Sequence, residues 1–139
     1  MARSLERIAY SSIATIPLDS LLVIADILAV SQRNNARDRL TGALVYSEGR
    51  FFQVIEGETV DVDRLMKRVA VDPRHADINV VSRTFVDERM FSDWSMSAPR
   101  ISPEMAPLLK KAVDESQNSP AAAIELVLQI SIKDGIHSG

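Results

Sequence analysis

One amide lies where a strand would place it inside the protein. Residues 49–57 read GRFFQVIEG, and their aromatic and β-branched side chains are typical of a strand. Alternation along a strand puts Gln53 on one face with Phe51 and Ile55. Because the other face ends in the charged Glu56, we expect the face of Gln53 to be the buried one. A buried amide without partners costs about 1–3 kcal/mol, so hydrogen-bonding groups should surround it.

A tyrosine is a second polar residue expected in the same core. Tyr10 shares a face with Ile8 in a predicted strand, residues 5–12. Its hydroxyl can donate a hydrogen bond to Gln53, and its phenol can be oxidised. Taken singly, a buried tyrosine is more often a packing residue with one satisfied hydroxyl. Gln53 could bond Tyr10 and have no further role.

Two further pairs of residues have a structural and a functional interpretation. Asn34 and Asn35 follow a predicted helix, where asparagine is more often a cap than a ligand contact. Trp94 and Met96 lie near a predicted strand and have the character of ordinary core residues. Each residue alone favours the structural interpretation, and only their combination favours a binding site.

Composition excludes several classes of chemistry. The 139 residues contain no cysteine and carry a formal net charge of −3. The absence of cysteine removes disulfides, thiol nucleophiles and thiolate metal sites, and no Gly-rich phosphate loop or metal-ligand spacing is present. The charge gives no general attraction to nucleic acid or anionic membranes. Without a membrane span or a secretory signal, we expect a soluble cytoplasmic protein with no metal and no enzymatic activity.

Hydrophobic spacing predicts an α+β fold for the first hundred residues. The predicted strands are residues 5–12, 40–46, 49–57 and 78–86, with a short fifth strand around Trp94. The predicted helices run from Pro17 to near Asn34 and Asn35, and from an N-cap at Thr59 to Pro73. This β-α-β-β-α-β-(β) order favours a ferredoxin-like sheet with both helices on one face, the face of Gln53.

Beyond Pro99 the sequence becomes helical. Ser102 with Pro103, and Ser119 with Pro120, each form an N-cap followed by proline at the first helical position, and Pro107 should delay the first helix. We therefore divide the chain into a domain at residues 1–98 and a helical extension at residues 99–139. Two C-terminal helices with apolar surface should pack on the open sheet face or contact another protein chain.

Taken together, the motifs resemble the BLUF family of blue-light sensors that use FAD. The resemblance covers about the first hundred residues, in the order and spacing of the family. The motifs that carry it are Y-x-S at 10–12, S-x-x-N-N at 31–35, LTGALVY at 40–46, GRFFQVIEG at 49–57, DPRH at 72–75 and WSM at 94–96. The combination of LTGAL with FFQxIEG is the most specific part.

The resemblance implies a photochemical role for two residues and a binding role for others. Tyr10 matches the tyrosine that gives an electron and a proton to the excited flavin, and Gln53 matches the glutamine that bridges it to the flavin ring. Asn35 and its neighbour Asn34 match the amides that bond the pyrimidine edge of the flavin, and which of them is the main contact stays open. Ser31 matches a serine near the ring.

The remaining matches concern the far side of the cofactor and the output. Arg74 and His75 match an Arg-His pair at the end of the second helix. Trp94 and Met96 match strand residues that exchange contacts with the glutamine during signalling. The resemblance implies a sensor that acts through an effector protein or by forming a homo-oligomer. The effector, the oligomeric state, the rate of dark recovery and the position of Trp94 inside or outside the flavin pocket stay open.

Two other functions stay open. A flavin-free ligand-binding or oligomerisation module on the same fold would be colourless, with Gln53 satisfied internally. An acylphosphatase-like hydrolase also fits a ferredoxin-like sheet. It would need an arginine beside an asparagine that positions water, and Arg33 or Arg37 with Asn35 is the nearest candidate, in the wrong kind of element.

Overall fold

A four-stranded antiparallel sheet is the centre of the fold. The computed structural model describes residues 5–15, 33–72, 75–92, 94, 99 and 101–138. The strands are β1 (Leu5–Ala14), β2 (Thr41–Ser47), β3 (Arg50–Glu58) and β4 (His75–Phe85), in the order β2-β3-β1-β4. The helices are α2 (Thr59–Val71), α3 (Ala106–Asp114) and α4 (Pro120–Ser138).

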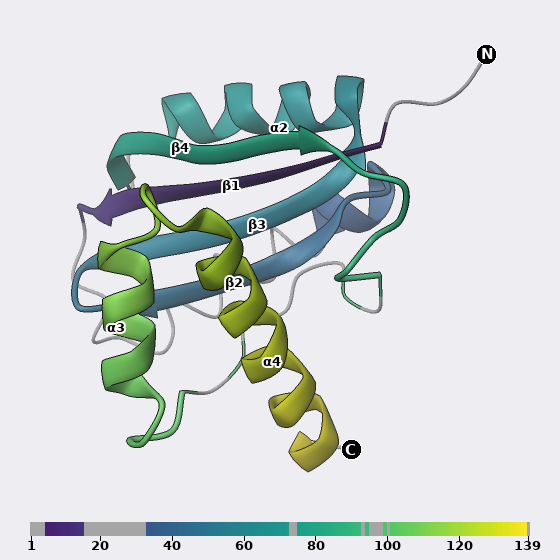
Figure 1. Cartoon of the computed structure of the whole chain (residues 1–139). Coiled ribbons are helices and arrows are strands. Elements are labelled where there is room, and N and C mark those ends of the chain that lie inside the picture. Colours follow the sequence, from purple (N-terminus) through teal and green to yellow (C-terminus); the bar gives the residue numbers. More distant parts are fainter. Residues whose placement is uncertain are drawn as a thin grey trace.

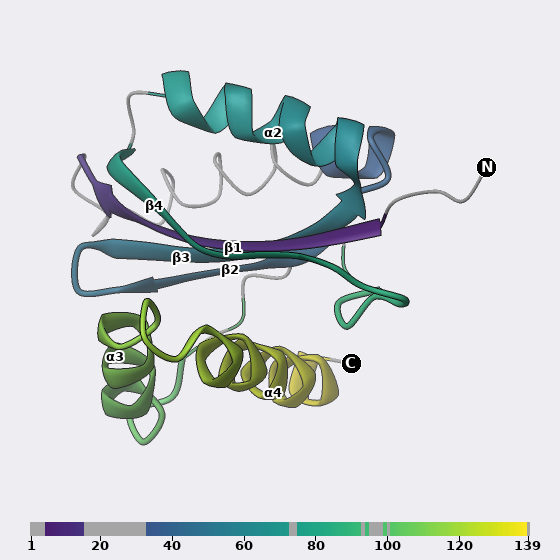
Figure 2. The ribbon, with the colours of Figure 1, turned by 45° about the horizontal axis from the view of Figure 1, so that its top comes forward.

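The helices form one layer on each face of the sheet. Figure 2 shows α2 on one face, together with the helical turn at residues 33–37, and α3 and α4 on the other. Two central strands, β1 and β3, separate the edge strands β2 and β4 (Figure 1). This order is the one expected of a ferredoxin-like sheet, and the predicted fold class is confirmed.

The two faces of β3 are both buried, which corrects one expectation. Phe52 and Val54 are fully buried on the face opposite Gln53, and so is Glu56. The charge of Glu56 therefore does not mark a solvent-facing side. The prediction failed because a carboxylate can be buried when donors surround it, and the guanidinium of Arg7 lies 2.8 Å from it.

Helix α2 covers the face of Gln53 with a stripe of apolar residues. Its buried residues are Val62, Leu65 and Val69, at the spacing of one helical face. They pack with Tyr10 on β1, in the cluster that also contains Ile8, Leu40 and Ile55. The helix begins at Thr59, so the N-cap is Glu58 and not Thr59 as predicted.

The C-terminal helices cover the other face. Helix α4 begins at Pro120, as predicted. Helix α3 begins at Ala106 with Met105 as N-cap and Pro107 in its first turn, so the predicted N-cap at Ser102 with Pro103 is wrong and the delay expected from Pro107 is confirmed. Ser102 precedes α3 by four residues and accepts a hydrogen bond from the amide of Met105, so it caps a turn before the helix. The cluster that these helices share with the sheet is Ala9, Ala43, Val45, Phe52, Val54, Phe91, Leu109, Val113, Ala123, Ile124, Val127 and Ile130.

Two glycines of the β2–β3 hairpin have different roles. Glu48 and Gly49 have φ of 45° and 85°, as the two central residues of a type I′ turn require. Gly42 is needed for a close approach, because a Cβ there would lie 2.0 Å from the carbonyl oxygen of Val54. The amide of Gly42 donates to the carbonyl of Trp94, at 3.0 Å.

Two predicted boundaries differ from the structure. The helical turn at 33–37 continues past Asn34 and Asn35, and its left-handed residue is Arg39, with φ 57°. The amide of Leu40 bonds the carbonyl of Asn35, which is the long bond of a Schellman ending. Strand β4 begins at His75, three residues before the predicted start.

Other predictions fall partly outside the described residues. Residues 17–32 of the predicted first helix lie outside them, as do Ser95 and Met96 of the predicted fifth strand. Trp94 is described and is not part of a strand. Within the described part of the chain, no helix is long and apolar enough to cross a membrane.

Candidate functional site

Tyr10 and Gln53 meet in the middle of the sheet. They lie directly opposite each other in the antiparallel register of β1 and β3. Opposite residues share a face, so both side chains point toward α2. The Tyr10 hydroxyl donates a hydrogen bond to Oε1 of Gln53, and the two residues are 2% and 6% exposed. The amide and the phenol are therefore one buried unit.

The surroundings of Tyr10 keep its phenol neutral. Burial raises the pKa of Tyr10 well above that of an ordinary tyrosine, and the negative charge of Asp72 raises it further. Apolar side chains of β1, β3 and α2 enclose the ring, among them Ile8, Ile55 and Leu65. In this low-dielectric environment the hydrogen bond to Gln53 is strong, and a Tyr10 hydroxyl or Gln53 amide without a hydrogen-bond partner would destabilise the fold.

The end of the helical turn brings an asparagine to the same layer. Asn35 is 1% exposed, and its backbone carbonyl accepts the amide of Leu40, a member of the Tyr10 cluster. Asn34 is only half-buried, and its carbonyl accepts the amide of Asp38. Of the two asparagines, Asn35 is the one whose side chain is enclosed by the fold.

Arg68 of α2 lies on the same side of the sheet as Gln53 and was not predicted as a site residue. Arg68 contacts the buried carboxylate of Asp38 at 3.2 Å, which ties α2 to the end of the helical turn. Hydrogen bonds from Arg37 and then from Arg68 hold the pKa of Asp38 below its usual range. The second nitrogen of Arg68, Nη2, is buried and has no hydrogen-bond partner among the described residues. Its position between Leu65 and Val69, at the border of the buried stripe, was the only sequence signal.

The other predicted residues are either outside the described part of the chain or away from the Tyr10–Gln53 pair. Ser31, Arg74 and Met96 lie outside the described residues. His75 was expected at the end of the second helix, but its backbone is the first residue of β4, and its side chain is not described. Trp94 lies with the C-terminal helices, where its ring centre is 6.3 Å from that of Phe91.

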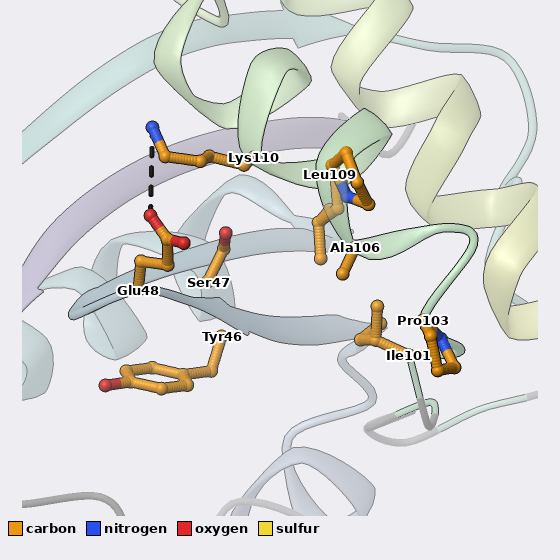
Figure 3. Close-up of a pocket in the computed structure, with 9 residues that line it drawn as sticks. Tyr46, Ser47, Glu48, Ile101, Pro103, Ala106, Leu109 and Lys110 are labelled. Carbon is orange, nitrogen blue, oxygen red and sulfur yellow. Dashed lines mark ion pairs between the residues drawn. The ribbon is translucent and has the colours of Figure 1, made fainter.

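A pocket on the far side of the molecule is distinct from this site. The cavity has a volume of about 560 Å³ and lies between the end of β2 and α3. Figure 3 shows Lys110 of α3 facing Glu48 of the turn after β2, and their charged groups are 3.8 Å apart. Tyr46 points away from this cavity in the figure. Neither Tyr10 nor Gln53 lines it. Within the described part of the chain, no cluster of three histidines or carboxylates could hold a metal ion.

Comparison with known proteins identifies the relatives of this chain. The family model "Sensors of blue-light using FAD" matches residues 5–97. The photoactivated adenylate cyclase subunit beta of Euglena gracilis is 34% identical over 96 residues, which cover 68% of this chain and 11% of that protein. The alpha subunit of Euglena gracilis is 35% identical over 98 residues, 70% of this chain and 10% of that protein. The chain therefore spans only a small part of these curated relatives.

Solved structures agree with the family match. BlrB, a BLUF protein in its dark state, has a TM-score of 0.76 at 26% identity, covering 95% of this chain and 97% of BlrB. A bacterial light-regulated adenylyl cyclase has a TM-score of 0.73 at 33% identity, covering 91% of this chain and 40% of that one. The match extends over most of the described fold, so the chain belongs to the BLUF family of flavin-binding blue-light sensors.

Proposed function

We propose that this chain senses blue light through FAD held on the α2 face of the sheet, and that Gln53 converts the photochemistry into a signal. The observation that carries the proposal is the buried hydrogen bond from Tyr10 to Gln53. The bond joins an oxidisable phenol to an amide whose donor and acceptor ends can exchange, and apolar residues enclose both. Apolar side chains of the same shape could stabilise the fold about as well, so stability alone does not explain the pair. It suits a proton-coupled switch.

The side chains of this face fit the polar edge of a flavin. The pyrimidine edge of a flavin alternates carbonyl acceptors with an N–H donor, and a carboxamide can match both. Asn35 and Gln53 supply two carboxamides in this layer. Nη2 of Arg68 supplies a buried donor that suits a carbonyl oxygen or an anionic group of the cofactor. Asn34, Ser31, Arg74 and His75 complete the proposed set on the strength of the family resemblance.

Tyr10 is the proposed donor. A bound flavin supplies the absorption of blue light and an excited state that takes up an electron. Tyr10 loses one electron, and since an oxidised phenol is a far stronger acid, its hydroxyl proton leaves along the bond to Gln53. Both are regained when the charges recombine, so Tyr10 is unchanged at the end. The neutral phenol that burial maintains is the form this reaction needs.

Gln53 is the proposed switch. Its oxygen accepts from Tyr10 in the structure described above. Rotation or tautomerisation of the amide would exchange donor and acceptor ends without a change in volume. A new hydrogen bond from Gln53 to the cofactor then persists and shifts the flavin absorption to the red. Glutamate could not act as such a neutral bridge, and leucine could make no hydrogen bond.

The output is proposed to pass through Trp94 and Met96 to the C-terminal helices and from there to a partner. The Euglena relatives are named as photoactivated adenylate cyclases, so related domains occur in proteins with a catalytic activity. For this chain we propose an effector protein or a second copy as the receiver, and no enzymatic turnover of its own. Residues 1–98 are the proposed sensor and residues 99–139 the proposed output extension.

The first experiment is an absorption spectrum in the dark and after blue illumination. We expect a flavin spectrum that shifts to the red and relaxes in the dark, and the nucleotide released on denaturation should be FAD and not FMN. A flavin spectrum without a shift would leave the binding site and reject the switch. A colourless protein that takes up no FAD on reconstitution would favour the alternative, a flavin-free ligand-binding or oligomerisation module.

Two substitutions then assign the roles. Gln53→Leu should retain the flavin and lose the red shift, because the bridge is gone. Tyr10→Phe should also lose it while the protein stays folded, and Tyr46→Phe, on the exposed tyrosine, is the matched control. A full red shift in Gln53→Leu would reject the switch assignment, and unfolding of Tyr10→Phe would favour a packing role for Tyr10.

A further inference from the structure

A buried carboxylate holds the segment that follows β4. Glu56 is fully buried on the face of β3 opposite Gln53. Its Oε2 accepts hydrogen bonds from Nε of Arg7 and from the backbone amide of Met90, both at 2.8 Å, and its Oε1 accepts the amide of Phe91 at 2.7 Å. A carboxylate that receives two consecutive amides fixes the backbone that supplies them. The amides of Met90 and Phe91 are thus attached to the centre of the sheet by one side chain.

An arginine of the same segment fixes its other side. Arg89 donates from Nη1 to the hydroxyl of Thr41 at 2.9 Å and to the carbonyl of Glu56 at 3.1 Å. Its Nη2 donates to the carbonyl of Arg39 at 2.8 Å, where the helical turn beside Asn35 ends. The segment therefore contacts β2, β3 and the end of the helical turn that carries Asn35. The two faces of the sheet are linked at this edge.

The residues held by Glu56 lead directly to Trp94. Phe91 is fully buried in the cluster formed with α3 and α4. Its carbonyl accepts the amide of Trp94 at 3.2 Å, and the two rings lie 6.3 Å apart. The carbonyl of Trp94 accepts the amide of Gly42 on β2. The backbone of Trp94 is thus bonded to Phe91 and to Gly42, and Glu56 holds Phe91 in place.

We propose that Glu56 is a positioning residue that sets the place of Trp94, and that it couples the α2 face of the sheet to the C-terminal helices. Glu56 and Gln53 are three residues apart on one rigid strand but face opposite layers. A change on the Gln53 face reaches α3 and α4 through residues 86–92 and Phe91. The coupling half of this inference rests on the proposed function, whereas the positioning half does not.

The matched pair of variants is Glu56→Gln and Glu6→Gln. Glutamine keeps the size of Glu56, but its Nε2 replaces one acceptor oxygen and faces donors. Either the bond from the amide of Phe91 or the bonds from Arg7 and the amide of Met90 are therefore lost. Glu6 is also a buried carboxylate, and it bonds Nε of Arg83 at 2.8 Å instead of the segment. Each variant removes the charge of one buried carboxylate and its ion pair with an arginine, and only Glu56→Gln also removes the acceptor of the Met90 or Phe91 amide.

The positioning half is tested in the dark, on the full chain as purified. Trp94 is the only tryptophan, so its fluorescence reports its own surroundings. Glu56→Gln should shift the emission to the red, raise quenching by acrylamide, and speed hydrogen exchange of the Met90 or Phe91 amide about tenfold or more. Glu6→Gln should leave all three as in the unmodified chain. Unchanged Trp94 emission and exchange in Glu56→Gln, or equal changes in both variants, would overturn the proposal.

The coupling half is tested by hydrogen exchange in α3 and α4 before and after illumination. In Glu56→Gln, we expect the red shift of the flavin to persist while the light-dependent change in these helices is lost. In Glu6→Gln, both should persist. An undiminished change in the helices of Glu56→Gln would overturn the coupling. Absence of any red shift in the unmodified chain would instead reject the proposed function, and the dark measurements would still decide the position of Trp94.

Discussion

Alkaline pH tests the surroundings of Tyr10, because its folded and unfolded states should lose the phenol proton at different pH. In the unfolded chain the phenol of Tyr10 loses its proton at about pH 10. In the folded chain, burial and then the charge of Asp72 raise the pKa of Tyr10, so the phenol stays neutral. Above about pH 10 the unfolded chain therefore binds one proton fewer than the folded chain.

The sign and size of the effect follow from this difference. When the folded state holds the extra proton, the free energy of unfolding falls as the pH rises. The contribution is fully present below about pH 10 and is lost through the window between the two pKa values. One proton corresponds to about 1.4 kcal/mol per pH unit. Over a single pH unit this is a measurable share of the stability of a small domain.

Urea unfolding in the dark, from about pH 9 to about pH 11, measures this slope. Lysines and the cofactor also titrate in this range, so the quantity of interest is the difference between the unmodified chain and Tyr10→Phe. That difference should fall by about 1.4 kcal/mol per pH unit above about pH 10. Tyr46, which is 38% exposed, provides the control Tyr46→Phe, which should keep the slope. An identical slope in Tyr10→Phe would refute the buried, neutral phenol.

Two further substitutions test the end of the helical turn and the arginine of α2. Arg39→Gly should raise the free energy of unfolding by about 1 kcal/mol, because Arg39 has φ 57° and glycine adopts this conformation without strain. Lys67→Gly, at an exposed position inside α2, should lower it by about 1 kcal/mol, and a loss in Arg39→Gly as well would contradict the Schellman ending. Arg68→Met should weaken flavin binding about tenfold or more, measured by titration of the apoprotein with FAD. Arg64→Met, which removes a second contact to Asp38, should bind flavin normally, and equal losses in both would indicate a purely structural role for the cluster.

The elements could be predicted where local patterns decide them. The type I′ turn at Glu48 and Gly49 follows from the sequence SEGR between two strands. The apolar stripe of α2 and the first residue of α4 follow from helical spacing and from Pro120. The contact between Tyr10 and Gln53 could be predicted because their side chains were expected on the same face of two neighbouring strands. These features depend on neighbours in sequence or on strand pairing.

Two of the remaining features depend on residues far apart in the chain, and the third depends on where a helix ends. Glu56 looked like a solvent-facing charge, because its partners Arg7 and Phe91 lie 49 and 35 positions away. The buried nitrogen of Arg68 depends on how α2 packs, which the spacing of α2 alone does not specify. The left-handed residue was predicted at an asparagine, yet the chain places Arg39 there, since the position of the helix end is set by the bond from Leu40. Tertiary contacts decide the first two features, whereas a local backbone bond at the helix end outweighs the propensity of asparagine in the third.

The packing of the sheet offers no steric route for the change proposed at Gln53. Exchange of the two ends of an amide leaves its volume unchanged, so it exerts no steric push on neighbours. The adjacent residues on β3, Phe52 and Val54, are fully buried in a cluster that resists displacement. A change that is purely one of hydrogen bonding must therefore leave through groups that respond to hydrogen bonds. The hydrogen bonds of Glu56 are such contacts, because its carboxylate accepts the amide of Phe91 and the carbonyl of Phe91 accepts the amide of Trp94. Arg89 adds bonds from the same segment to β2 and to the end of the helical turn.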